Sequence, residues 1–138
     1  ICFKYNVQFF ITKMIMKPLF IQYPKCGTCR KAAQWLKSNH IDVTIRDIVS
    51  DNPTQQELSV WIEKSGKPIQ KFFNTNGLRY KELNLKDKIK NTQQEELLRI
   101  LASEGMLVKR PVLISGNTVL TGFNEEEWSK ALLKPEKV

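Results

Sequence analysis

Apolar residues fall into short runs and helical stripes that predict alternating strands and helices. A compact apolar run at 19–22 is typical of a buried strand. Apolar residues then recur at helical spacing over 32–39, and they alternate with polar residues over 41–45, which predicts a second strand. Residues 19–46 therefore predict strand, helix, strand: a βαβ unit with a right-handed crossover.

A block with helical periodicity follows this unit. Its first helix begins either at Asn52, with Pro53 in the first turn, or at Thr54, which forms a capping box with Glu57. Leu58, Trp61 and Ile62 form the buried stripe of this helix, which ends at Gly66. Further helical pieces are expected at 68–73, 83–89 and 92–104, with a turn at 74–77.

The third of these pieces is expected to begin with a capping box of Thr92 and Glu95. Residues 112–120 then predict a β-hairpin with its turn at 115–117, and Asn124 can cap a last helix. The order is β-α-β, a helical insert, then β-β-α. This order predicts an α/β protein of thioredoxin-like fold, with a mixed sheet and helices inserted after the second strand.

The chain length of 138 residues fits one domain, which we expect to occupy 17–138. Residues 1–16 look foreign to it: they begin with Ile1, are only mildly apolar, and lack the features of a signal peptide. Translation from Met16 or Met14 is one interpretation, with 1–16 a non-native or disordered extension. A genuine N-terminal extension is the other. No apolar run approaches the length needed to cross a bilayer.

The chain is basic, with 22 Lys and Arg against 14 Asp and Glu and a net charge of +8. The lysines are scattered, without a dense block or a nucleic-acid recognition motif. A solvated basic surface that attracts small anions therefore explains the charge at least as well as nucleic-acid binding does. We expect neither nucleic acid nor a membrane as a partner.

Three cysteines are too few for a disulfide framework, which suggests a reducing compartment. Cys2 lies in the foreign-looking segment, whereas Cys26 and Cys29 form a Cys-x-x-Cys motif between the first strand and the first helix. The free N–H groups of a helix start stabilise negative charge, and Lys25, Arg30 and Lys31 add positive charge. We therefore expect a lowered pKa at Cys26, which would attack as a thiolate, with Cys29 one turn later as the resolving thiol.

Other uses of two cysteines at this spacing fit less well. A purely structural pair is disfavoured by its position at an exposed helix start. A zinc site needs four ligands, and only Cys2 and His40 remain, so no metal is expected. A c-type haem site would need His at position 30, which is Arg. A phosphatase-type anion loop would need Arg at position 32, which is Ala. His40 is expected at the end of the first helix, in a surface or capping role.

Arg110-Pro111 is a second candidate feature. A Pro directly before a strand in this layout is a candidate cis peptide, in a loop that faces the active-site cysteine of thioredoxin-like proteins. Arg110 would then hold an oxyanion or a substrate carboxylate in the same pocket. An ordinary surface Arg beside a strand-initiating Pro explains the sequence equally well.

Several blocks together carry a resemblance to a known family. They are 23–32 (YPKCGTCRKA), 73–83 (FNTNGLRYKEL), 85–88 (LKDK), 105–113 (GMLVKRPVL) and 121–123 (TGF). Through them the chain resembles the arsenate reductase (ArsC) family over 17–133, and most closely its ArsC/Spx-like branch. The resemblance implies a thioredoxin-like fold and a cytoplasmic bacterial protein.

The resemblance also implies roles for individual residues. In glutaredoxin-linked arsenate reductases, one Cys attacks arsenate and three arginines hold the oxyanion. Cys26 matches the nucleophile and Arg110 matches one arginine, but the other two positions fall near Asn74 and Gly122. These departures weaken arsenate as the substrate and leave thiol–disulfide chemistry intact. The expected substrate-binding residues are Gly27, Thr28, Arg30, Asn74 and Pro111, beside the catalytic set Cys26, Cys29 and Arg110.

The expected activity is that of a thiol-dependent oxidoreductase acting on a small oxyanion or a disulfide. It would hold no bound cofactor and would take electrons from a redox partner, through glutathione and glutaredoxin or through thioredoxin. Spx regulators of the same family instead use a Cys-x-x-Cys switch and bind RNA polymerase, through the carboxy-terminal domain of its α chain. A redox-switched regulator is therefore the alternative, although the sequence at 73–77 departs from the regulators.

Overall fold

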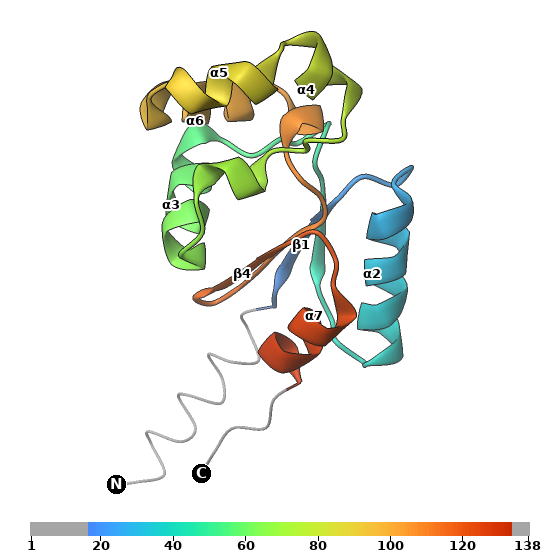
Figure 1. Ribbon diagram of the computed structural model, residues 1–138. Helices are drawn as coiled ribbons and strands as arrows, with labels where there is room; N and C mark the ends of the chain where they lie inside the picture. The colour runs from blue at the N-terminus through green and yellow to red at the C-terminus, as the bar shows by residue number, and fades with distance from the viewer. Residues whose placement is uncertain (1–16, 134–138) are drawn as a thin grey trace, which may run out of the picture.

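The computed structural model describes residues 17–133, which are built around a four-stranded mixed sheet (Figure 1). The central strand β1 (Leu19–Gln22) runs parallel to β2 (Thr44–Asp47) and antiparallel to β3 (Val112–Ser115), which pairs with β4 (Thr118–Thr121). The strand order is β2-β1-β3-β4. This is the thioredoxin-like α/β arrangement that the sequence predicts.

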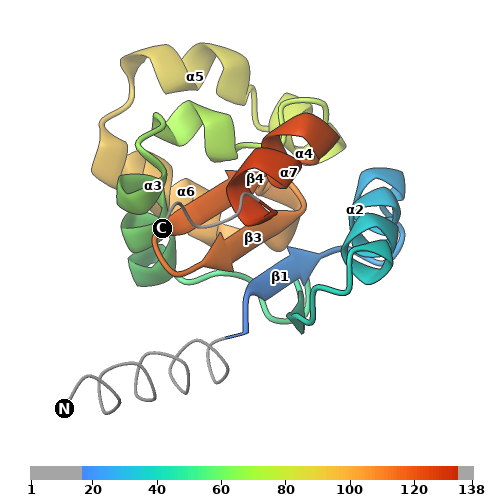
Figure 2. The ribbon, with the colours of Figure 1, turned by 90° about the horizontal axis from the view of Figure 1, so that it is seen from below.

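The two faces of the sheet carry separate hydrophobic cores. Successive residues of a strand point to opposite faces, so Phe20 and Ile21 of β1 belong to different cores. Helices α2 (Gly27–Ser38) and α7 (Glu125–Leu132) cover the Phe20 face, where Trp128 is fully buried. The helical insert covers the Ile21 face, and Figure 2 shows the sheet between these two layers.

The insert connects β2 to β3 through six short elements. They are α3 (Gln55–Ser65), η1 (Ile69–Phe72), α4 (Leu78–Glu82), α5 (Leu85–Asn91), α6 (Gln94–Ser103) and η2 (Gly105–Leu107). Its beginning and end are joined near the sheet, because the Asn52 side-chain amide donates to the Ala102 carbonyl at 2.7 Å. Gly105 also packs against the backbone of Ile48, closely enough that a Cβ would lie 1.8 Å from the Ile48 carbonyl oxygen.

A second backbone connection brings the functional segments together. The N–H of Lys109 donates to the Phe72 carbonyl at 2.7 Å, and the N–H of Asn74 donates to the Leu107 carbonyl at 2.8 Å. The chain after η1 therefore lies beside the chain that leads into β3.

The first helix of the insert, α3, is capped by the box at Thr54 and does not start at Asn52. The Thr54 hydroxyl accepts from the N–H of Glu57, and the Glu57 carboxylate accepts from the N–H of Thr54. The same carboxylate binds the Arg46 guanidinium with two hydrogen bonds of 2.7 and 2.9 Å. The helix ends at Gly66 in the left-handed conformation, with φ of 68°.

Two sequence-based expectations about elements are wrong in detail, and one helix is not predicted. Helix α6 begins at Gln94, and its N-cap is Gln93 without a side-chain hydrogen bond; the Thr92 hydroxyl donates to the Lys88 carbonyl of the preceding helix instead. The second strand begins only at Thr44, and its Ile45 is 63% exposed because β2 is an edge strand. Helix α4 is not foreseen by the sequence pattern, since only Tyr80 of its five residues is buried.

The helices of the described residues include none with the length and apolar character needed to span a membrane. The expectation for residues 1–16 falls outside the described residues.

Candidate active site

The two cysteines of the motif differ sharply in environment. Cys26 is the N-cap of α2, with extended backbone angles (φ −88°, ψ 122°), and its thiol is half-buried. Cys29 lies in the first turn of the helix and is fully buried. The turn before the helix is closed by the N–H of Cys26, which donates to the Tyr23 carbonyl at 2.9 Å. One sulfur is therefore accessible and the other is shielded behind it.

Opposing effects set the pKa of Cys26, and the net result is a pKa below its ordinary value. Partial burial raises the pKa, but hydrogen bonds from the Cys29 backbone N–H, the Cys29 thiol and the Arg110 guanidinium together lower it by more. The positive charge of Arg110 acts in the same direction. Cys26 is thus the group of this pair that ionises first.

Burial raises the pKa of Cys29 to about 12. The N–H of Tyr23, which donates to the Cys29 sulfur at 3.5 Å, offsets only part of this effect. A negative charge on Cys26 raises the pKa of Cys29 further, so the two thiols do not ionise together near neutral pH.

Arg110 lies beside the cysteines and belongs to the segment that leads into β3. The Arg110–Pro111 peptide bond is cis, as expected, and the guanidinium carbon lies 5.2 Å from the centre of the Tyr23 ring. Its Nε and Nη1 atoms are buried without a hydrogen-bond partner among the described residues. Buried guanidinium nitrogens without acceptors are suited to an anionic or carbonyl-bearing ligand.

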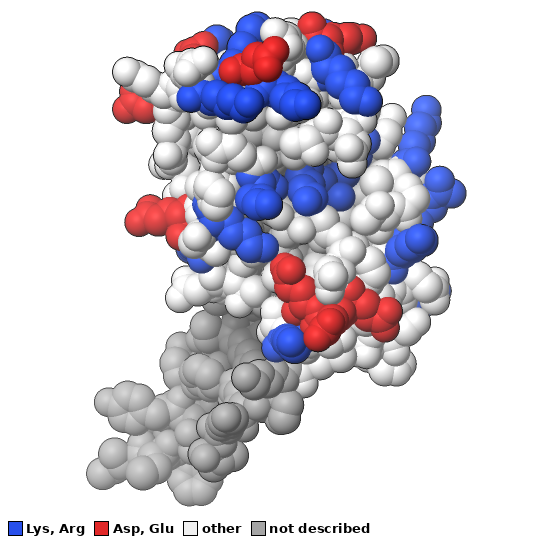
Figure 3. Space-filling model, in the orientation of Figure 1, with Lys and Arg blue, Asp and Glu red and all other residues white. Residues whose placement is uncertain are grey.

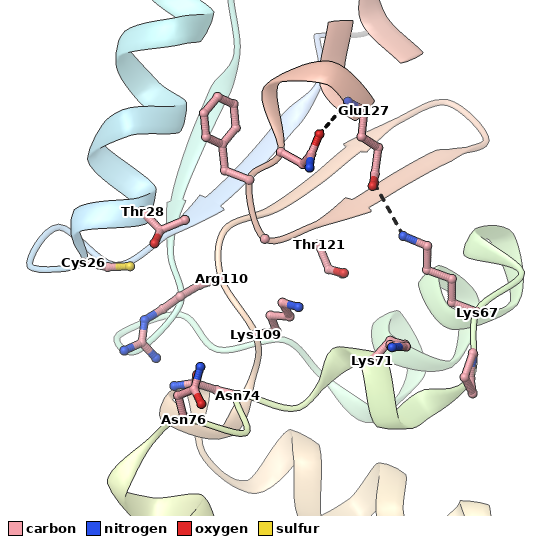
Figure 4. A pocket seen from close by; sticks show the side chains of 14 residues that line it. Cys26, Thr28, Lys67, Lys71, Asn74, Asn76, Lys109, Arg110, Thr121 and Glu127 are labelled. Atoms are coloured by element: carbon pink, nitrogen blue, oxygen red, sulfur yellow. Dashed lines mark hydrogen bonds and ion pairs between the residues drawn. The ribbon is translucent and has the colours of Figure 1, made fainter. Parts of the chain in front are cut away.

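Cys26 and Arg110 share a pocket of about 700 Å³, seen from close by in Figure 4. The pocket lies between the start of α2, the start of α7 and the helical insert. Its lining also includes Thr28, Lys67, Pro68, Lys71, Asn74, Asn76, Lys109, Thr121, Gly122, Phe123, Asn124 and Glu127.

The structure places some of the predicted binding residues at this pocket and others outside it. Thr28 and Asn74 line it. Gly27 begins α2 and Pro111 is buried, and neither is part of the lining. Arg30 is exposed on the outside of α2, where its guanidinium makes a 3.5 Å contact with the Lys25 carbonyl.

Sequence reasoning missed the lysines of the pocket. Lys67, Lys71 and Lys109 belong to two segments about forty residues apart, and the sequence carries no spacing signal that joins them. They meet because the N–H of Lys109 bonds to the Phe72 carbonyl. In Figure 3, basic side chains gather in the hollow between the helical insert and α7.

Gly122 takes the position near which the family resemblance places an arginine of an oxyanion site. It adopts φ of 69°, and a Cβ there would lie 3.0 Å from the Lys109 side chain. Clusters of three or more metal-ligating side chains are absent from residues 17–133. The arrangement thus offers one ionisable sulfur, one shielded sulfur and a cationic pocket.

Comparison with known proteins gives consistent results. A family model described as the ArsC family matches residues 21–131. The protein YusI of Bacillus subtilis is 44% identical over 115 residues, covering 83% of this chain and 98% of YusI. The regulatory protein MgsR of the same organism is 31% identical, covering 80% of this chain and 86% of MgsR. The crystal structure of a putative ArsC family related protein from Bacteroides fragilis superimposes with a TM-score of 0.81 at 53% identity, covering 83% and 97% of the two chains.

Proposed function

The chain belongs to the ArsC family, and from this premise we propose that it is a thiol-dependent oxidoreductase that uses Cys26 and Cys29 as a dithiol–disulfide couple. The observation that carries the proposal is the asymmetry of the two sulfurs. Cys26 is accessible with a lowered pKa, while Cys29 is buried one turn away with a raised pKa. This is the division that a nucleophilic and a resolving thiol require.

The reaction proceeds in two exchange steps. The Cys26 thiolate attacks one sulfur of a substrate disulfide, forms a mixed disulfide, and expels the other half of the substrate as a thiolate that takes up a proton. Cys29 then loses its proton and attacks the Cys26 sulfur, which releases the second half as a thiol and forms the Cys26–Cys29 disulfide. The substrate gains two electrons, and the protein loses them.

Loss of the negative charge of Cys26 in the first step makes Cys29 easier to ionise for the second step. The thiolate of Cys26 raises the pKa of Cys29. Once Cys26 is in a mixed disulfide, that negative charge is gone, so Cys29 ionises more readily only after the first step has occurred. An external dithiol or glutathione-dependent donor would reduce the protein disulfide again, and we assign the protein to the reducing cytoplasm.

A disulfide is favoured over arsenate as the substrate. Asn74 and Gly122 stand where the oxyanion arginines of related reductases are expected, and neither carries a charge. Arg110 is the only arginine among the lining residues, and it would hold a substrate carbonyl or carboxylate rather than a fully caged oxyanion.

A redox-switched regulator is the second candidate, supported by the similarity to the regulatory protein MgsR. In that role the Cys26–Cys29 disulfide would change docking to a protein partner such as RNA polymerase. Loss of a captured partner on oxidation, together with failure to exchange with any disulfide, would favour the regulator over the oxidoreductase.

The test is a stoichiometric reaction of the reduced full chain with bis(2-hydroxyethyl) disulfide, a small neutral substrate. We expect the unaltered protein to release both halves of the substrate as thiol and to end as the internal disulfide. Cys29→Ser should release only one half and retain the other on Cys26, as seen by mass spectrometry. Cys26→Ser should release neither, while Cys2→Ser serves as the matched control and should behave as the unaltered chain. Full thiol release by Cys26→Ser would overturn the proposal.

A further inference from the structure

The pocket beside Cys26 holds more positive charge than thiol activation requires. Its lining contains four cationic side chains, Lys67, Lys71, Lys109 and Arg110, against a single carboxylate, Glu127. Arg110 acts on Cys26, whereas the lysines are absent from the groups that shift the Cys26 pKa. Activation of the Cys26 thiol therefore does not explain why the three lysines line the pocket.

Two of these lysines are free to bind a ligand. Within residues 17–133, Lys71 and Lys109 make no ion pair, while Lys67 contacts Glu127 at 3.5 Å. Both Lys71 and Lys109 are exposed to solvent at the pocket. A pair of uncompensated ammonium groups in one hollow attracts anions and repels cations.

The arrangement of the charges suits an extended ligand better than a compact one. Figure 4 shows Lys109 between Arg110 and Lys71, while the Lys67 side chain points toward Glu127. A single small oxyanion held between Cys26 and Arg110 would leave Lys71 and Lys109 without a partner, since Lys67 already contacts Glu127. A ligand with several carboxylates in a row would reach them.

The opposite rim of the pocket carries the opposite charge. Glu125, Glu126 and Glu127 form the first turn of α7, and acidic side chains gather there in Figure 3. Of these three residues only Glu127 lines the pocket, where it contacts Lys67 at 3.5 Å, and Glu126 pairs with Lys130 at 3.2 Å. The lining cations left for the carboxylates of a ligand are therefore Lys109 and Lys71, together with Arg110 beside Cys26. The positive and negative side chains of the pocket thus lie on different sides of it.

On the basis of the proposed oxidoreductase function, we propose that the substrate is a disulfide whose cysteine lies in an acidic protein segment. The segment's carboxylates bind Lys109 and Lys71 while its sulfur meets Cys26. Lys71 and Lys109 are then specificity-determining residues: they raise the encounter rate and orient the substrate, and they take no part in the exchange itself.

The experiment compares two peptides that differ only in charge. Each has a single cysteine, blocked as a mixed disulfide with 2-mercaptoethanol, followed by four Glu residues in one peptide and four Gln residues in the other. The rate constant for reaction with Cys26 of the reduced full chain is measured by acid quench and mass spectrometry. We expect the Glu peptide to react about tenfold faster at low ionic strength, the combined effect of two exposed ion pairs.

Matched variants locate the effect. In the double variant Lys71→Gln/Lys109→Gln the ratio of the two rates should fall to about one, whereas Lys86→Gln/Lys90→Gln on α5, which removes the same charge away from the pocket, should keep it. Molar salt should also reduce the ratio, because the Debye length falls to about 3 Å. Equal rates for the two peptides in the unaltered chain, or an equal loss in both double variants, would overturn the proposal.

Two further arms separate the causes of failure. Oxidised glutathione is a small acidic disulfide, and an equally large dependence of its rate on Lys71 and Lys109 would overturn the assignment to a protein segment. Fluorescence anisotropy with a cysteine-free Glu peptide measures binding without chemistry. If that peptide binds through the two lysines but neither disulfide peptide reacts, the oxidoreductase function fails while the acidic-segment site stands.

Discussion

The guanidinium of Arg110 lies over the ring of Tyr23, with its carbon 5.2 Å from the ring centre. The backbone N–H of the same tyrosine donates to the sulfur of Cys29. Tyr23 therefore contacts both groups that flank Cys26: its ring holds the cation, and its backbone faces the buried thiol. A contact of this kind contributes on the order of 1 kcal/mol and fixes where the positive charge of Arg110 lies.

Replacement of Arg110 should make Cys26 less reactive. Arg110→Met removes a hydrogen bond and a positive charge that lower the pKa of Cys26, so that pKa should rise and the thiolate fraction at neutral pH should fall. We expect alkylation of Cys26 by iodoacetamide at pH 7 to slow by about threefold or more. Arg30→Met removes the same charge from the exposed side of α2 and is the control. An equal effect of both variants would contradict the role of Arg110.

The two thiols should react in order as the pH is varied. Because the pKa of Cys26 is lowered, its alkylation rate should fall as the pH drops through that value and level off above it. Cys29, with a pKa of about 12, should remain unmodified in the folded protein across the neutral range. Peptide mapping after limited alkylation checks this directly. Modification of Cys29 before Cys26 would contradict the assignment of nucleophile and resolving thiol.

The ion pair of Glu57 and Arg46 should stabilise the fold in a pH-dependent way. Hydrogen bonds from Arg46 are the largest effect that lowers the pKa of Glu57, to about 2 in the folded protein. A depressed carboxyl pKa stabilises the fold at a pH above the unfolded value of about 4.3, and this contribution disappears as the pH falls toward 2.

Glu57→Gln tests this contribution, since the amide oxygen of Gln can keep the capping box, while the charge and one of the two hydrogen bonds from Arg46 are lost. The carboxylate is about one third exposed, so solvent screening reduces the expected loss to about 1–2 kcal/mol at pH 7. Urea unfolding of both proteins should show this difference at pH 7 and little difference near pH 2. A constant difference across the pH range would indicate lost packing and not lost charge.

Gly105→Ala should destabilise the fold strongly. A Cβ at this position would lie 1.8 Å from the carbonyl oxygen of Ile48 and 2.6 Å from its carbonyl carbon, so the backbone itself must move. We expect a loss of about 3 kcal/mol or more in the free energy of unfolding. Gly27→Ala is the matched control, because nothing lies within 4 Å of its Cβ. Equal stability of the two variants in thermal unfolding would contradict the close approach.

Local signals explain why the fold could be predicted from the sequence. Gly66, the box of Thr54 and Glu57, and the cap at Asn124 each act within a few residues of their own position. The capping box expected at Thr92 does not form, for a related reason: the Thr92 hydroxyl makes another local hydrogen bond, to the Lys88 carbonyl. The second strand is expected from the alternation over 41–45 and contains Ile45, but it begins only at Thr44, because alternation does not fix where a strand starts.

Only part of the candidate site could be predicted from the sequence. Cys26 and Cys29 are one helical turn apart, so their relation follows from local geometry. Lys71 and Lys109 are brought together by a backbone pairing between distant segments, which hydrophobic periodicity does not encode. Arg110 could be placed only through the layout of the whole fold.

The division of the strands between two cores has a consequence for how such a protein can diverge. Phe20 faces the layer that carries the cysteines, and Ile21 faces the layer that supplies Lys67 and Lys71. Mutations that repack the helical layer leave the opposite layer in contact with unchanged side chains. Under the proposed roles, partner choice can therefore evolve while the sulfur chemistry stays unchanged, because the two are built on opposite sides of one sheet.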